Sequence, residues 1–109
     1  MQHVTMADKS FLIGDETARL LLEWAALVAK MSSGDAVHIH SISDDGDEVM
    51  ANLLLNSGTA LMTESSHSPL PEPENAKVDA YLRERIGAYE INTEDFIGFP
   101  QESAEQSAD

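Results

Sequence analysis

The chain has 109 residues, and its six lysines and arginines face 20 aspartates and glutamates, so the formal net charge is −14. A protein this acidic lacks the basic stripe with which nucleic-acid readers neutralise phosphates, and the absence of cysteine excludes disulfides and thiolate metal sites. No apolar run reaches the roughly 18 residues that a bilayer-spanning helix needs, and the first residues do not read as a secretory signal. We therefore expect a cytoplasmic protein that binds neither nucleic acid nor membrane.

Two short apolar pieces open the chain. Residues 3–6 and 11–13 flank the polar stretch 7–10, a pattern that predicts a small β-hairpin. A long helix is predicted next, over residues 16–31, because leucine and alanine dominate this stretch. Asp15 is the expected N-cap, and Gly34 is the expected left-handed residue after the last turn.

The apolar side of this long helix is unusually broad. On a helical wheel its charged residues fall within an arc of roughly 60°, whereas an ordinary surface helix has an apolar stripe of about 100°. The helix therefore needs cover on two sides. One side can be the sheet, and the other is either a second helix of the same chain or another protein molecule. In the second case, the predicted interface consists of Leu20, Trp24, Leu27 and Met31.

Three strands and a second helix follow. Residues 36–42, 49–55 and 60–64 are predicted to form an antiparallel meander, with 49–55 as a central strand because of its three leucines. Proline-rich residues 65–73 form an extended linker. A second helix is predicted from Ala76 to about Ile86, with Asn75 as its cap and Gly87 as its stop. This amphipathic helix is a candidate to cover the second flank of the long helix.

The predicted organisation is one domain with a tail. Residues 1–90 form a single α+β domain, built from the hairpin, the long helix, the three-stranded meander and the short C-terminal helix. Residues 91–109 form an acidic tail that is expected to be largely disordered, because it is poor in apolar side chains beyond residue 100. Phe96 and Phe99 stand out beside acidic residues in this tail. They either fold back onto the domain or form a short docking segment for a partner.

Two histidines are the candidate chemistry of the chain. His38 and His40 alternate along a predicted strand, so their side chains share one face at a spacing of about 7 Å. With an oxygen from Asp45 they could bind zinc or a similar metal. The alternative is that they are the polar face of a half-exposed strand. No nucleophile elbow, phosphate loop or dinucleotide fingerprint occurs, so we expect no enzyme and no resident cofactor.

The order of these elements resembles a family of small uncharacterised actinobacterial proteins, some of which are labelled ATP-dependent DNA ligases. The resemblance covers about residues 3–86 and is carried by Lys30, by Gly34-Asp35, and by the stretch LLLNSGTALM from Leu53 to Met62. The basic residues that usually follow the family's helix, and its aromatic strand residues, are missing here. The resemblance implies a compact ββαββα-like domain of unknown function. It supplies no catalytic residue, and nothing in these residues supports the ligase label.

Three hypotheses for the function follow. The first is a non-enzymatic module for protein interaction or self-association, possible as a homodimer, through the helix flank or through Phe96 and Phe99. The second is a small-ligand or metal-binding domain that uses the strand face of His38 and His40. The third is an acidic inhibitor that imitates nucleic acid and occupies a basic protein, because the net charge is −14.

Overall fold

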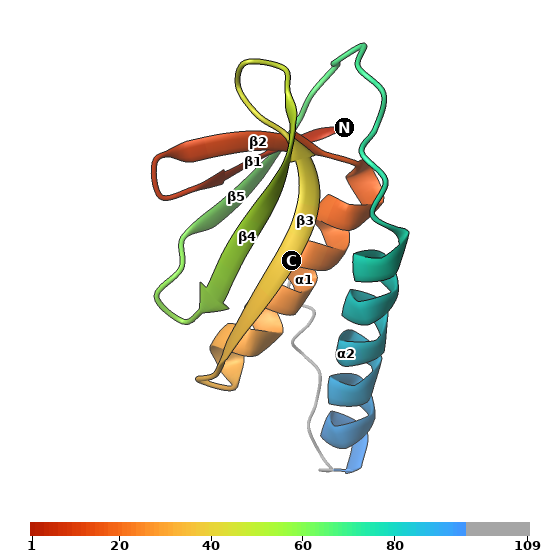
Figure 1. The fold of residues 1–109 in the computed structure, drawn as a ribbon. Helices are drawn as coiled ribbons and strands as arrows, with labels where there is room; N and C mark the ends of the chain where they lie inside the picture. The colour runs from red at the N-terminus through yellow and green to blue at the C-terminus, as the bar shows by residue number, and fades with distance from the viewer. Residues whose placement is uncertain (96–109) are drawn as a thin grey trace.

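The computed structural model describes the backbone of residues 1–95 and the side chains of residues 1–89. Five strands and two helices make up this part of the chain, which confirms the α+β fold class (Figure 1). In chain order they are β1 (Gln2–Met6), β2 (Lys9–Ile13), α1 (Asp15–Lys30), β3 (Gly34–Ile42), β4 (Glu48–Asn56), β5 (Leu61–Ser65) and α2 (Ala76–Asp95). Neither helix is long and apolar enough to cross a membrane.

The five strands form one antiparallel sheet in the order β4-β3-β2-β1-β5. Strands β3 and β4 pair along their whole length, from Gly34 opposite Asn56 to Ile42 opposite Glu48. By contrast, β2 and β3 pair only where Leu12 lies opposite Ile42. The two parts of the sheet therefore meet at one corner and diverge from it, with β1 and β2 running across the top and β3 and β4 descending (Figure 1).

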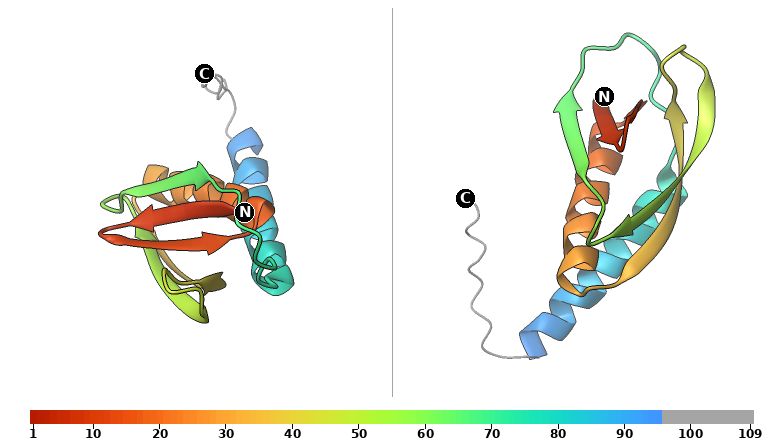
Figure 2. Two further views of the ribbon diagram at one scale, coloured as in Figure 1. Left: turned by 90° about the horizontal axis from the view of Figure 1, so that it is seen from above. Right: turned by 90° about the vertical axis from the view of Figure 1, so that its left-hand side faces the viewer.

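Helix α1 lies against the inner face of the sheet, and α2 lies beside α1 and β3 (Figure 2). Alternate strand residues point inward, so each strand contributes every second side chain to the core. The buried hydrophobic residues of this core are Val4, Phe11, Ile13, Ala18, Leu20, Leu21, Trp24, Val28, Val37, Ile39, Leu53, Leu55, Leu82 and Ile86. The outer face of the sheet carries the other set of side chains and has no helix over most of it.

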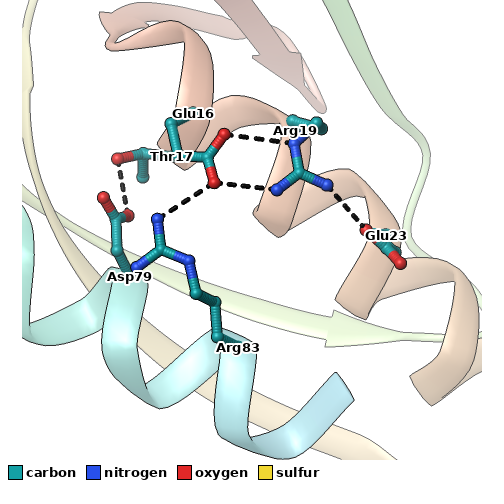
Figure 3. Close-up of polar contacts among 6 residues, drawn as sticks. All are labelled: Glu16, Thr17, Arg19, Glu23, Asp79 and Arg83. Carbon is teal, nitrogen blue, oxygen red and sulfur yellow. Dashed lines mark hydrogen bonds and ion pairs between the residues drawn. The ribbon is translucent and has the colours of Figure 1, made fainter. Parts of the chain in front are cut away.

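Polar contacts join the first turns of the two helices (Figure 3). The hydroxyl of Thr17 donates to the Asp79 carboxylate at 2.7 Å, and Thr17 is buried. The Glu16 carboxylate accepts hydrogen bonds from Arg19 of its own helix at 2.8 Å and from Arg83 of α2 at 3.0 Å. These two guanidinium groups lower the pKa of Glu16 to about 2, and Arg19 has the larger effect.

This ion cluster predicts a pH-dependent difference between the wild type and a Glu16→Gln variant. The folded pKa of about 2 lies below the ordinary value of 4.5, so the carboxylate stabilises the fold above pH 4.5. That contribution is lost as the pH falls from about 4.5 towards 2. We expect Glu16→Gln to melt at a lower temperature than the wild type near neutral pH, and the difference to vanish near pH 2. High salt should also reduce it, because the group is exposed.

Glu84→Gln is the matched control, since Glu84 is an exposed α2 carboxylate without an ion pair in the described part of the chain. Melting curves of the three proteins across this pH range, by circular dichroism, check the prediction. A Glu16→Gln difference that persists unchanged down to pH 2 would contradict it.

The predicted meander of three strands is wrong in one respect. Strand β5 does not pair with β4 but with the free side of β1, over five residues from Gln2 opposite Ser65 to Met6 opposite Leu61. After β4 the chain makes a β-turn over residues 56–59, in which the Thr59 N–H donates to the Asn56 carbonyl at 3.1 Å and the Thr59 hydroxyl accepts the Asn56 N–H at 3.2 Å. The strand β4, predicted as central, is consequently an edge strand, and Leu54 is 60% exposed.

Both helices also end differently from the prediction. Helix α2 continues through Gly87 to Asp95, since one helical glycine costs only about 1 kcal/mol and the preceding turns are anchored by Leu82 and Ile86. Helix α1 ends at Lys30, and Gly34 is not the left-handed residue that follows it. Ser32 adopts the left-handed conformation, with φ of 51°, and its N–H and that of Ser33 cap the last turn in a Schellman motif.

Candidate functional site

A groove lies between the outer face of β3 and β4 and the first half of α2. Its volume is about 500 Å³, within the 300–1,000 Å³ that is usual for ligand sites. We call it the β3–α2 groove. The residues that line it are Ala36, Val37, His38 and His40 of β3, Met50 of β4, and Glu74, Asn75, Lys77, Val78 and Tyr81 at the start of α2. It forms because β2 leaves β3 after a single pair, so α2 and not a strand flanks β3 here.

The edge of β3 that faces this groove has no strand partner over residues 34–41 in the described part of the chain. The side chain of Asn75 takes the place of a strand at one point. Its Oδ1 accepts the N–H of His40 at 2.9 Å, and its Nδ2 donates to the carbonyl of His40 at 2.8 Å. Asn75 is buried, at 7% exposure, so this amide is a fixed part of the groove wall.

The same edge has further backbone groups facing the groove. In an antiparallel strand the N–H and C=O groups of successive residues point to opposite sides, so those of His38 and Ala36 point the same way as those of His40. No hydrogen bond from outside the β3–β4 ladder reaches the backbone of Ala36 or His38 in the described part of the chain. Two residues of β3 therefore present unpaired backbone donors and acceptors to a groove of ligand size.

Tyr81, which lines the groove, is bonded to Asp35 near the start of β3. One carboxylate oxygen of Asp35 accepts hydrogen bonds from the Trp24 indole N–H and from the Tyr81 hydroxyl, both at 2.7 Å. These two bonds join α1, α2 and the start of β3. Two effects raise the pKa of Tyr81 above its ordinary value. Burial of the phenol is the larger effect, and its hydrogen bond to Asp35 is the next largest. The phenol thus stays neutral and keeps donating to Asp35 throughout the physiological pH range.

The predicted alternation of the two histidines is confirmed, since His38 and His40 both point to the outer face and both line the groove. A metal site is not supported. The Nδ1 of His38 lies 2.7 Å from the side-chain oxygen of Asn52, and the Nδ1 of His40 lies 3.8 Å from Glu48. Asp45 is held in its own turn by Ser43, whose hydroxyl lowers the pKa of that carboxyl. No group of three or more metal-ligating side chains comes together among the described residues.

The predicted interface on α1 is largely covered by the chain itself. Leu20 and Trp24 are 2% and 3% exposed, because α2 packs against α1. A second helix of the same chain was one of the two covers that the sequence allowed for this flank. The guanidinium of Arg85 also lies 5.5 Å from the centre of the Trp24 ring. Leu27 is partly buried against the core, and Met31 remains 41% exposed. Phe96 and Phe99 lie outside the described residues.

Sequence reasoning missed the main role of Asn75. We expected this residue to cap α2, but its side chain pairs with His40, and the carboxylate of Glu74 accepts the first helical N–H, from Ala76, at 2.8 Å. No local signal could have shown this, since the two partners are 35 residues apart in the sequence.

Comparisons with family models, with curated proteins and with solved structures found no match to this chain. The resemblance to the small actinobacterial family therefore stays a prediction. The geometry of the β3–α2 groove is the basis for a functional assignment.

Proposed function

We propose that this chain is a non-enzymatic binding module that holds a short extended peptide segment of a partner protein in the β3–α2 groove. The observation that carries the proposal is the Asn75 amide, which pairs with both backbone groups of His40 as a neighbouring strand would. A peptide can continue that pattern along His38 and Ala36. Addition of a strand to an open sheet edge is a recurring mode of peptide recognition.

The groove selects for a short segment. The Asn75–His40 pair occupies the edge of β3 at His40, so a ligand that pairs with this edge would lie along residues 36–39 of β3. Residues 36–39 of a strand span roughly 10 Å, which accommodates about three to four peptide residues.

The side chains around the free edge favour an uncharged, partly apolar peptide. Val78 and Met50 offer apolar walls, and Ala36 is small enough to leave the edge accessible. The net charge of −14 disfavours an acidic ligand, although Lys77 and His38 supply local polar contacts. Backbone pairing would provide the main affinity, and these side chains would provide selectivity.

A blocked tripeptide of valine, threonine and valine tests the proposal by amide NMR of the isotope-labelled protein. We expect saturable shifts at the backbone N–H signals of Ala36 and His38, and a weaker response from a peptide whose central amide is N-methylated. Ala36→Trp should abolish binding, because the indole fills the groove without removing a core side chain. Ala80→Trp is the matched control, since Ala80 is exposed on α2 and does not line the groove.

Two outcomes would contradict the proposal. One is the absence of saturable shifts at Ala36 and His38, and the other is binding that Ala36→Trp leaves unchanged. A fluorescent apolar dye such as anilinonaphthalene sulfonate provides a further comparison. Suppose that the dye binds the wild type but not Ala36→Trp, and that no peptide causes shifts. The groove then takes a small apolar molecule and not a peptide.

A further inference from the structure

The free edge of β4 is a second interaction surface, which shares Met50 with the β3–α2 groove but lies on the other side of β4 from β3. Strand β4 pairs with β3 on one side only, because β5 pairs with β1, and its nine residues extend for roughly 30 Å. Natural edge strands are usually short or are protected by charged side chains, proline or a bulge. None of these devices occurs in residues 49–56 of β4, although a quarter of the chain is charged.

Three of the five exposed side chains of β4 are apolar. Met50 is 49% exposed and Leu54 is 60% exposed, and both point to the outer face on either side of Asn52. Val49 is also 40% exposed. An unprotected strand with this composition is a template for pairing with another strand.

Backbone N–H and C=O groups of β4 point to its free edge, as pairing with another strand requires. The groups of His40 point away from β4 towards Asn75, so His40 and Met50 form a non-hydrogen-bonded pair of the ladder. The N–H and C=O groups of Met50, and by alternation those of Asn52 and Leu54, then point to the free edge. These three residues are therefore the ones that an added strand would bond.

We propose that the occupant of this edge is a second copy of the chain, whose β4 pairs antiparallel with β4 about a two-fold axis at Asn52. In this register Met50 lies opposite Leu54 of the second copy, and Leu54 lies opposite Met50 of the second copy. The four side chains then form one apolar cluster on the outer face of a ten-stranded sheet that runs through both copies. Cross-strand apolar pairs of this kind stabilise an antiparallel ladder.

The exposed apolar side chains of β4 are spaced symmetrically about Asn52, which fits a second copy as the partner, and the charges of the strand do not prevent this pairing. A chain with a net charge of −14 repels its own copies, so self-association needs a contact from which acidic groups are absent. The register about Asn52 meets this requirement, because Glu48 lies opposite Asn56 of the second copy and no two acidic residues face each other. The remaining repulsion is long-range and is screened by salt. The dimer should therefore tighten as salt is added, whereas an ionic complex would weaken.

Absolute mass from light scattering, over a range of concentrations at low and high salt, tests this interface. We expect the wild-type mass to rise from one chain towards two with concentration, and to do so at lower concentration in high salt. Leu54→Lys should remain monomeric, because it places a charge in the apolar cluster. Met62→Lys, an exposed residue on the outer face of the opposite edge strand β5, should dimerise like the wild type.

Amide hydrogen exchange tests the register. On dimerisation, protection should increase at Met50, Asn52 and Leu54, while the alternate residues, already bonded to β3, should change little. A mass that stays at one chain at the highest soluble concentration in high salt would overturn the proposal. So would a dimer that Leu54→Lys leaves intact, or one that Met62→Lys disrupts.

Discussion

Replacing Leu82 by alanine is expected to lower the free energy of unfolding by about 2–5 kcal/mol, the usual cost of removing a fully buried leucine. Leu82 is 0% exposed and belongs to the hydrophobic core. With Ile86 it is one of the α2 side chains buried in this core, where α2 packs against α1. Each kcal/mol shifts the melting temperature of a domain of this size by roughly 4–8 °C, so the effect is large in a thermal melt.

Chemical denaturation of Leu82→Ala and of a matched variant, Leu22→Ala, checks the prediction. Leu22 lies on the same pair of helices but is 42% exposed, and its truncation should cost less than about 1 kcal/mol. Leu82→Met keeps most of the volume and should cost less than about 1.5 kcal/mol, so it remains measurable if the alanine variant does not fold. Equal losses for Leu82→Ala and Leu22→Ala would mean that α2 is not docked on α1 in solution.

Local patterns in the sequence predicted the elements but not their partners. The broad apolar arc of α1 indicated correctly that this helix needs cover on two sides, because periodicity records how much surface is buried. It could not say that α2 supplies the second cover. That depends on contacts such as Thr17 with Asp79, which are 62 residues apart.

The strand order could not be predicted from local sequence patterns for the same reason. Strand β5 follows β4 after a short turn, and consecutive strands are usually neighbours, so a meander was the natural expectation. The alternation of side chains in β5 is equally compatible with pairing to β1. The pairing of β5 with the free side of β1 is a contact between segments far apart in the sequence, and it is not visible as a pattern of hydrophobicity.

The candidate site was half predictable. Alternation in β3 placed His38 and His40 on one face correctly, because a strand has a period of two. The groove itself depends on the divergence of β2 from β3 and on the Asn75 side chain. Both are tertiary features, and the metal hypothesis arose because the third ligand had to be guessed from a turn of unknown direction.

Replacing Asn75 by leucine is expected to cost about 2–4 kcal/mol, since a leucine of similar size covers the N–H and C=O of His40 without bonding either. Asn75→Ala should cost less, because the smaller side chain admits water to the same two groups. The order of these losses is unusual, since the larger side chain is the more harmful one. Chemical denaturation measures it, and Glu84→Leu, at an exposed position on α2, is the control.

The same Asn75→Ala variant separates a structural role from a role in peptide binding. Removal of the amide frees the edge at His40, so the open edge of β3 grows from two residues to three. If the β3–α2 groove binds by strand addition, a blocked tetrapeptide should bind this variant more tightly than the wild type and should also shift the His40 N–H signal. Loss of binding would instead identify Asn75 as a direct contact of the ligand, and an unchanged affinity would place the ligand away from the β3 edge.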